Sequence, residues 1–253
     1  MKEVKIGILG LGTVGAGVGR LLQENGSLIE AKSGVRITVA VAADLRPERQ
    51  EALGIPDGVF TVSPADVVND PGISVVVELI GGVTAARELT LQALERGKHV
   101  VTANKALLAE HGEQIIGRAI ANRVELGFEA SVGGGIPIIK AIRESLVGNR
   151  IDKIVGILNG TTNFILTKMT REGLGFDQAL RIAQELGFAE ADPTLDISGG
   201  DARHKITILS SFAFHTRVDM NHVYVEGIQG IEEQDLEYAG ELGFVLKLLA
   251  IAE

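Results

Sequence analysis

The sequence contains no cysteine and no tryptophan, and only two tyrosines among 253 residues. Without cysteine the chain forms no disulfide, carries no thiolate nucleophile and binds no metal through sulfur. A formal net charge of −9 argues against a nucleic-acid-binding surface. Apolar runs such as residues 74–80 are too short to cross a bilayer, and Lys2, Glu3 and Lys5 interrupt any signal-peptide core. The composition therefore favours a cytoplasmic protein without nucleic-acid or membrane partners.

The first strong motif is a glycine-rich loop near the N-terminus. Residues 4–9 are mostly apolar, and Gly10, Gly12 and Gly15 follow with the spacing G-x-G-x-x-G. The first glycine permits a tight turn, the second lets the backbone approach a pyrophosphate, and the third lets strand and helix pack closely. The start of the following helix offers unpaired N–H groups to the anion. We therefore predict dinucleotide binding here; the alternative is a tight strand–helix turn without a ligand.

The first half of the chain alternates short apolar strands with helices. Strands rich in Val and Ile are expected at residues 4–9, 35–44, 74–80, 98–103 and 124–130. Helices are expected to include residues 19–24, 84–97 and 114–120. This alternation predicts an α/β fold with a Rossmann-type, doubly wound parallel sheet over residues 1–130. Ligands of such sheets bind beyond the carboxyl ends of the strands.

Asp44 ends the second predicted strand, where an acidic residue normally binds the ribose hydroxyls of the adenosine. It lies 29 residues after Gly15 (44 minus 15) instead of the usual spacing of about 20. We interpret residues 24–34 as an insertion that accounts for the excess. An acid here favours NAD, but Arg46 is close enough to bind the 2′-phosphate of NADP, so the choice of cofactor stays open. The alternative role of Asp44 is that of a turn or cap residue.

From residue 131 the pattern changes, and residues 131–253 are expected to form an α+β region. The expected elements are a helix at 136–148, a strand at 151–158 and helices at 161–171 and 176–186. An acidic segment follows, with Glu190, Asp192, Asp196 and Asp201. One interpretation is a solvated turn in which Asp192 or Ser198 caps the next helix. The other is a pocket for a cationic substrate group such as an α-ammonium.

Two lysines are candidates for proton transfer. Asp201 and Lys205 are spaced i,i+4 and share one face of a predicted helix. This spacing is more often a surface ion pair, but the apolar residues 206–214 that follow indicate burial. A partly buried lysine exchanges protons more readily because burial disfavours its charged form. Lys105 follows the strand at 98–103 on the expected ligand side; the alternative is a solvated residue at the start of a helix.

Six blocks of the sequence, in order, resemble the homoserine dehydrogenase family. They are GILGLGTVG, VVVELIGG, GKHVVTANKALLA, FEASVGGGIPIIKAI, GILNGTTNFIL and ELGFAEADPTLDISGGDARHK, and they extend over nearly the whole chain. The resemblance implies an NAD- or NADP-dependent oxidoreductase that reversibly oxidises L-homoserine to L-aspartate 4-semialdehyde. This reaction belongs to threonine, methionine and isoleucine biosynthesis. The resemblance also implies a homodimer joined through the second region.

By this resemblance Lys205 is the proton donor and acceptor, Lys105 is a second active-site lysine near the nicotinamide, and Asp201 is a further catalytic residue beside Glu190. The implied substrate-binding positions are Glu190, Asp196, Gly160 and Thr161. The implied cofactor-binding positions are Gly10, Leu11, Gly12, Thr13, Val14, Gly15, Asp44, Lys105 and Gly187. The resemblance also implies a monovalent cation, sodium or potassium, at the Glu129 side chain and the carbonyls of Val132, Gly134 and Ile136. Such oxygen ligands suit a hard cation.

Two features depart from the family pattern. Many members carry Arg before the strand-end acid, where this chain has Ala43, and the difference tilts the cofactor toward NAD without deciding it. The family usually continues with further strands and often a regulatory domain, so the region 131–253 is expected to be truncated at its C-terminal end. The alternative function is a non-catalytic dinucleotide-binding sensor or oligomerisation fragment. A short-chain dehydrogenase would need Tyr-x-x-x-Lys, which neither Tyr224 nor Tyr238 begins.

Overall fold

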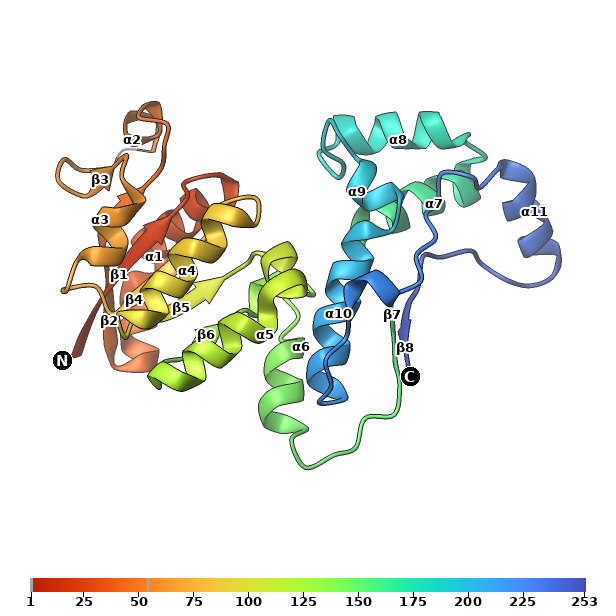
Figure 1. Cartoon of the computed structure of the whole chain (residues 1–253). Helices are drawn as coiled ribbons and strands as arrows, with labels where there is room; N and C mark the ends of the chain where they lie inside the picture. Colours follow the sequence, from red (N-terminus) through yellow and green to blue (C-terminus); the bar gives the residue numbers. More distant parts are fainter. Residues whose placement is uncertain (1, 54) are drawn as a thin grey trace. The chain divides into compact units, whose positions relative to one another are not determined.

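The computed structural model describes residues 2–53 and 55–253. Its contacts divide the chain into two compact units, the first up to Pro137 and the second from Ile138 to Glu253. Figure 1 shows the helices and strands of both units, coloured along the chain. In the described part of the chain, every helix is too short or too polar to cross a lipid bilayer.

The first unit is built on a six-stranded parallel sheet. Its strands are β1 (Lys2–Leu9), β2 (Val35–Ala43), β3 (Phe60–Thr61), β4 (Val75–Glu78), β5 (His99–Thr102) and β6 (Leu126–Gly127). Their order in the sheet is β3-β2-β1-β4-β5-β6, with parallel pairing throughout. Strands β2 and β3 lie on one side of β1, whereas β4, β5 and β6 lie on its other side. The direction in which the chain adds strands therefore reverses between β1 and β4. In sheets of this kind the ligand binds beyond the carboxyl ends of these two strands. The predicted Rossmann-type, doubly wound sheet is confirmed.

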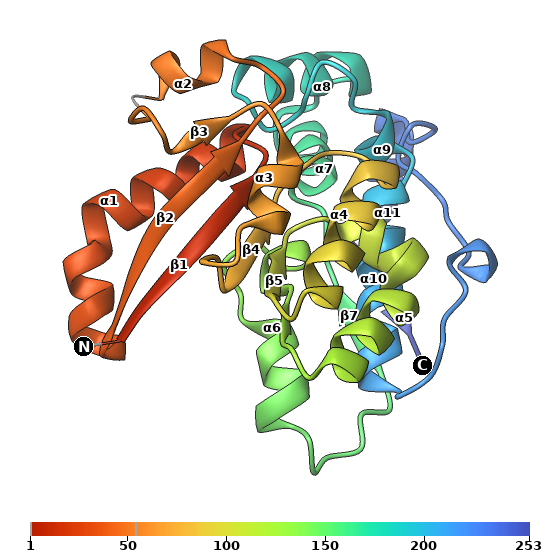
Figure 2. The same ribbon diagram turned by 60° about the vertical axis from the view of Figure 1, so that its left-hand side comes forward.

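Helices cover both faces of this sheet. They are α1 (Thr13–Ser33), α2 (Glu48–Ala52), α3 (Pro64–Asn69), α4 (Thr84–Glu95) and α5 (Lys105–Asn122). Helices α3, α4 and α5 pack side by side on one face, and α1 lies on the other (Figure 2). Right-handed crossovers that leave the centre of the sheet in opposite directions require this arrangement.

Helix α1 is longer than predicted. The segment 24–34, interpreted as an insertion, continues the helix to Ser33, and Gly34 then ends it in the left-handed conformation with φ of 71°. The Gly34 N–H donates to Glu30 O at 2.8 Å and closes the last turn. Gly26 does not end the helix, since a glycine inside a helix costs only about 1 kcal/mol. The long spacing between Gly15 and Asp44 is therefore due to additional helical turns.

The last strand of the sheet is shorter than predicted. The strand expected at 124–130 is reduced to the two residues of β6, because the chain turns into the 3₁₀ helix η1 (Glu129–Ser131). This turn packs against β5 and so remains part of the first unit. It carries Glu129, one of the residues predicted to bind a cation, at its first position.

The second unit is an α+β region, as predicted. Its elements are α6 (Ile138–Lys140), the π-helical turn η2 (Ala141–Ser145), β7 (Ile154–Gly156), α7 (Gly160–Glu172), α8 (Phe176–Glu185), α9 (Thr194–Ile197), α10 (Gly200–Ala213), η3 (Met220–His222), α11 (Glu233–Glu241) and β8 (Ala250–Ala252). Strands β7 and β8 pair antiparallel. Helix α7 packs against α8 and α11 around buried apolar side chains that include Ile165, Leu166, Met169 and Ala183.

Candidate functional site

The glycine loop turns sharply between β1 and α1. Gly10 has φ of 93°, and a Cβ there would lie 2.7 Å from Leu79 O, so both conformation and space require glycine. A Cβ on Gly15 would lie 2.0 Å from Gly10 O. A Cβ on Gly12, in contrast, would have no atom of the described residues within 4 Å. The loop is therefore tight at both ends and open in the middle, which suits close approach of a pyrophosphate.

The first turn of α1 is open to an anion. Gly12 is the N-cap of this helix and has no side chain to bind the first N–H groups. Thr13 and Val14 are exposed, whereas Leu11 is buried. The unpaired N–H groups of a helix start attract negative charge, and here they adjoin the open part of the loop.

Asp44, directly after β2, binds the glycine loop. Leu11 N–H donates to Asp44 Oδ2 at 2.9 Å, and the N–H and Nε of Arg46 donate to Oδ1, both at 3.0 Å. The Asp44 side chain is 7% exposed, whereas that of Arg46 is 52% exposed. The Arg46 guanidinium, followed by the backbone N–H groups, lowers the pKa of Asp44 to about 2. Asp44 is thus an ionised hydrogen-bond acceptor at the carboxyl-terminal edge of the sheet, where a ligand is expected. Because its side chain also accepts from the Arg46 N–H, it is at the same time the turn residue of the alternative interpretation.

The carboxyl end of β4 carries a fully buried acid that the sequence analysis missed. Glu78 accepts from Thr102 Oγ1 at 2.6 Å and from Ile80 N–H at 2.8 Å. Burial raises the pKa of Glu78 above its ordinary value in spite of these bonds. Asn104 Nδ2 donates to Ile80 O at 3.2 Å and to Gly82 O at 2.7 Å. Glu78 and Asn104 together hold the loops after β4 and β5.

Lys105 is the first residue of α5 and is half-buried. The N-cap of this helix is Asn104, whose Oδ1 accepts from Leu107 N–H at 3.0 Å. Because β1, β4 and β5 are parallel, the start of α5 lies at the same edge of the sheet as the glycine loop. The structure therefore places Lys105 at the carboxyl-terminal edge of the sheet in the first unit, the edge at which such sheets bind ligands.

The predicted cation-binding positions lie in the loop after β6. Glu129 begins η1, Val132 is buried, and Gly134 and Ile136 are exposed. Val132 N–H donates to Glu129 O at 3.3 Å, and Ile136 N–H donates to Gly133 O at 3.0 Å. The four positions therefore share one short loop with two consecutive turns.

A network of polar side chains joins the start of α7 to α9 and α10 in the second unit. Lys205 Nζ lies 2.7 Å from Asp201 Oδ2 and donates to Leu158 O at 2.8 Å. Asn159 Nδ2 donates to Asp196 Oδ1 at 2.6 Å and to Asp201 Oδ2 at 2.9 Å. The side chains of Asp201 and Lys205 are only 5% and 20% exposed. The i,i+4 pair is therefore largely shielded from solvent and is not the surface ion pair that this spacing more often forms.

The capping interpretation of the acidic segment is wrong. Pro193 is the N-cap of α9 and Gly199 is the N-cap of α10, so neither Asp192 nor Ser198 is the N-cap of the helix that follows it. Asp192 Oδ1 instead accepts from Thr194 N–H at 3.1 Å in the turn before α9. This turn carries the chain into α9, where Asp196 joins the Lys205 network.

The remaining predicted positions of the second unit lie at the start of α7 and in the loop after α8. Thr161 Oγ1 donates to Phe188 O at 2.6 Å and so joins these two segments. Gly160, Gly187 and Glu190 are exposed. Their exposure leaves them open to a ligand, and Gly187 turns the loop with φ of 76°.

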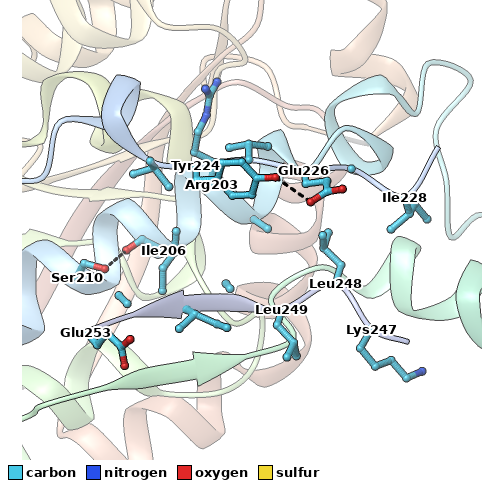
Figure 3. Close-up of a pocket in the computed structure, with 18 of the residues that line it drawn as sticks. Arg203, Ile206, Ser210, Tyr224, Glu226, Ile228, Lys247, Leu248, Leu249 and Glu253 are labelled. Atoms are coloured by element: carbon cyan, nitrogen blue, oxygen red, sulfur yellow. Dashed lines mark hydrogen bonds between the residues drawn. The ribbon is translucent and has the colours of Figure 1, made fainter. Parts of the chain in front are cut away.

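A separate cavity of about 1190 Å³ lies beside α10 (Figure 3). Arg203, Ile206 and Ser210 line it from the helix, together with Tyr224 and with Leu249, the residue before β8. In an α-helix successive residues are rotated by about 100° around the helix axis. Asp201 and Lys205 therefore project from α10 in directions that differ by about 100° or more from those of the three cavity residues. The cavity therefore belongs to the other face of the helix from the lysine network.

Comparison with known proteins identifies the family of this chain. One family model, described as the NAD binding domain of homoserine dehydrogenase, matches residues 10–129, and a second, described as homoserine dehydrogenase, matches residues 137–252. A crystal structure of a putative homoserine dehydrogenase from Archaeoglobus fulgidus is 33% identical, over 99% of this chain and 80% of that one, with a TM-score of 0.90. The chain belongs to the homoserine dehydrogenase family.

Two further homoserine dehydrogenase structures are similar to this family member. That from Thiobacillus denitrificans is 51% identical over 100% of this chain and 58% of that one, with a TM-score of 0.94. A hyperthermophilic archaeal homoserine dehydrogenase mutant, solved in complex with NADPH, is 30% identical over 99% and 79% of the two chains, with a TM-score of 0.82. The chain spans about 58% of the length of the curated homoserine dehydrogenases that it matches. The resemblance predicted from the sequence is confirmed.

Proposed function

We propose that this chain catalyses the reversible, NAD(P)-dependent oxidation of L-homoserine to L-aspartate 4-semialdehyde, in the route to threonine, methionine and isoleucine. The observation that carries the proposal is the partly buried network of Lys205, Asp201, Asn159 and Asp196 in a member of the homoserine dehydrogenase family. A lysine amine held in place away from bulk water is suited to general acid–base chemistry on an alcohol.

The glycine loop and Asp44 fit a nicotinamide dinucleotide. The pyrophosphate would lie on the open middle of the loop and the start of α1, against Gly10, Leu11, Gly12, Thr13, Val14 and Gly15. Lys105 at the same edge and Gly187 of the second unit complete the proposed cofactor contacts. Bound NAD(P) would supply the hydride acceptor. The related archaeal structure with NADPH supports a nicotinamide cofactor in this family.

We favour NAD over NADP because Asp44 is ionised at the place where the adenosine ribose binds. A carboxylate accepts hydrogen bonds from ribose hydroxyls and repels a 2′-phosphate. The Arg46 guanidinium already binds Asp44, and its side chain is 52% exposed. NADP binding would therefore require Arg46 to leave Asp44, and NAD binding would not.

The second unit would handle the substrate and its proton. The exposed Glu190 carboxylate and Asp196 would bind the α-ammonium of homoserine, and the backbone at Gly160 and Thr161 would contact its other polar groups. The Lys205 amine, held by Asp201, accepts the hydroxyl proton while hydride leaves the same carbon. In the reverse direction Lys205 returns this proton to the developing alkoxide and stabilises it by its positive charge. Lys105 would orient the substrate beside the nicotinamide.

The same proposal includes a monovalent cation and a homodimer. The side chain of Glu129 and the carbonyls of Val132, Gly134 and Ile136 offer oxygen ligands on one doubly turned loop, and such ligands suit sodium or potassium. Turnover in sodium or potassium chloride, compared with a salt of a bulky organic cation, tests the site. Sedimentation equilibrium tests the dimer that we propose for the second unit.

The reaction itself is tested by mixing the purified chain with L-homoserine and either NAD or NADP. Reduced nicotinamide is followed by absorbance at mildly alkaline pH, and we expect turnover that is faster with NAD. Lys205→Ala should abolish this turnover. Lys140→Ala is the matched control, because Lys140 also forms an i,i+4 pair, with Glu144, but an exposed one. Cofactor binding without homoserine turnover would instead support the non-catalytic sensor.

A further inference from the structure

Asn159 lies between β7 and α7 and is only 3% exposed. Its Oδ1 accepts from Thr162 N–H at 2.8 Å, so it is the N-cap of α7. A backbone N–H donates only to an acceptor atom, which fixes the amide oxygen on the side of the helix. The NH₂ group of Asn159 must therefore point away from α7.

Two carboxylates meet the NH₂ group on that side. Asp196 Oδ1 lies 2.6 Å and Asp201 Oδ2 lies 2.9 Å from Asn159 Nδ2. Carboxylates this close to one another repel unless hydrogen-bond donors lie between them. The NH₂ group has two hydrogens and two carboxylate acceptors, so both of its donor positions are used.

We propose that Asn159 is a positioning residue for the reaction, a role that rests on the proposed function of Lys205. Its amide holds Asp201, and Asp201 together with Leu158 O holds Lys205 Nζ. Leu158 and Asn159 are consecutive, so one short segment orients both the lysine and its carboxylate partner. The same Asn159 amide joins Asp196, the proposed contact for the substrate ammonium, to the proton-transfer pair.

Two substitutions separate this role from helix capping. Asn159→Ser and Asn159→Asp both keep an oxygen that caps α7, since Ser, Asp and Asn are similarly good N-caps. Neither supplies an NH₂ group. Serine is too short to reach the carboxylates, and aspartate places a third negative charge against them.

In both variants we expect kcat for homoserine to fall while NAD(P) affinity stays unchanged, because neither substitution alters a proposed cofactor contact. The expected loss is about 10²-fold for Asn159→Ser, the size that follows misplacement of a catalytic group by about 1 Å. It is larger for Asn159→Asp because of the added repulsion. Initial rates and a fluorescence titration of NADH measure the two quantities. Folded variants with wild-type kcat would show that Asn159 only caps α7, and the inference would be wrong.

Glu232→Ala is the matched control for loss of a cap. Glu232 is the N-cap of α11 in the same unit and forms a capping box with Asp235. This variant should lower the melting temperature and leave kcat unchanged. An equal fall of kcat in Glu232→Ala would assign the Asn159 effect to general loss of stability.

A wild-type chain that does not turn over homoserine would refute the proposed function, and NMR then tests separately whether the Asn159 amide holds the two carboxylates. In the wild type, both side-chain amide protons of Asn159 should resonate downfield and exchange slowly with water. One of them should move in Asp196→Asn and the other in Asp201→Asn. Ordinary shifts and fast exchange in the folded wild type would overturn the inference.

Discussion

The glycine loop and the Lys205 network prepare polar groups for a ligand by different means. In the loop the groups are backbone N–H groups, and the missing side chains of Gly10 and Gly15 give them their position. In the network the groups are side chains, and Asp201, Asn159 and Lys205 hold one another. A site made of backbone is sensitive to added volume, whereas a site made of side chains is sensitive to altered chemistry at equal volume.

The strongest test of this contrast is Lys205→Met, which keeps much of the side-chain volume and removes the amine. We expect the rate of homoserine oxidation to fall about 10²- to 10⁴-fold, the usual contribution of general acid–base catalysis. The affinity for NAD(P) should not change, because the glycine loop is untouched. Steady-state rates and cofactor titration provide the measurement. Near wild-type turnover would show that Lys205 does not carry the proton.

Next in size is Gly15→Ala, which adds one methyl group to the backbone-built site. This Cβ would lie 2.0 Å from Gly10 O, and we expect a loss of about 1–3 kcal/mol of stability together with weaker NAD(P) binding. Gly19→Ala is the matched control in the same helix, since its Cβ would meet no described atom within 4 Å. It should stabilise the fold by about 0.5–1 kcal/mol. Equal melting temperatures for the two variants would contradict the contrast.

A smaller effect is expected for Arg46→Ala, which removes the guanidinium that binds Asp44 beside the glycine loop. The pKa of Asp44 is about 2 in the folded chain, below its ordinary value of 3.8. Its contribution to stability is therefore present above about pH 4 and is lost as the pH falls through about 2. Arg46→Ala should be less stable than the wild type at pH 6, and the difference should narrow at pH 3.

Urea unfolding at the two pH values tests this sign, with Arg118→Ala as the control. Arg118 of α5 forms an exposed pair with Glu95 of α4. Arg46→Ala should also weaken NADP binding more than NAD binding. Equal losses for both cofactors would mean that Arg46 does not meet a 2′-phosphate.

The smallest effect is expected for Glu78→Gln behind the same loops. Burial raises the pKa of Glu78, so the wild-type fold loses stability as the pH rises above the ordinary value of 4.5. Glutamine stays neutral and can still accept from Ile80 N–H. The melting temperature of Glu78→Gln relative to the wild type should therefore be higher at pH 8 than at pH 4.5. A difference independent of pH would show that the acid does not titrate in this range.

The sequence predicts those elements whose residues carry a local signal. Strands β1, β2, β4 and β5 contain runs of Val and Ile, and the glycine spacing marks the loop after β1. Strand β3, Phe60–Thr61, is too short to show a period and was not predicted. The segment 24–34, interpreted as an insertion, continues α1 to Ser33, because the single Gly26 costs the helix only about 1 kcal/mol.

The Lys205 network could be predicted only in part. Asp201 and Lys205 are four residues apart, so their pairing follows from helical geometry. Asn159 precedes them by about forty residues, and only the fold brings its amide between Asp196 and Asp201. Its one local signal, an Asn directly before a helix, predicts a cap and contains no information on the carboxylates.

Helix α1 and strand β2 have matching lengths. The helix has 21 residues and the strand nine, and at about 1.5 Å and about 3.3 Å per residue both span about 30 Å. Helix α1 thus carries the chain away from the carboxyl-terminal edge of the sheet, and β2 brings it back to that edge over the same distance. An insertion or deletion keeps Asp44 at the glycine loop only if it changes both elements, by roughly two helical residues for each strand residue. The number of residues between Gly15 and Asp44 then measures the length of the domain along its strands. It carries no information on the cofactor.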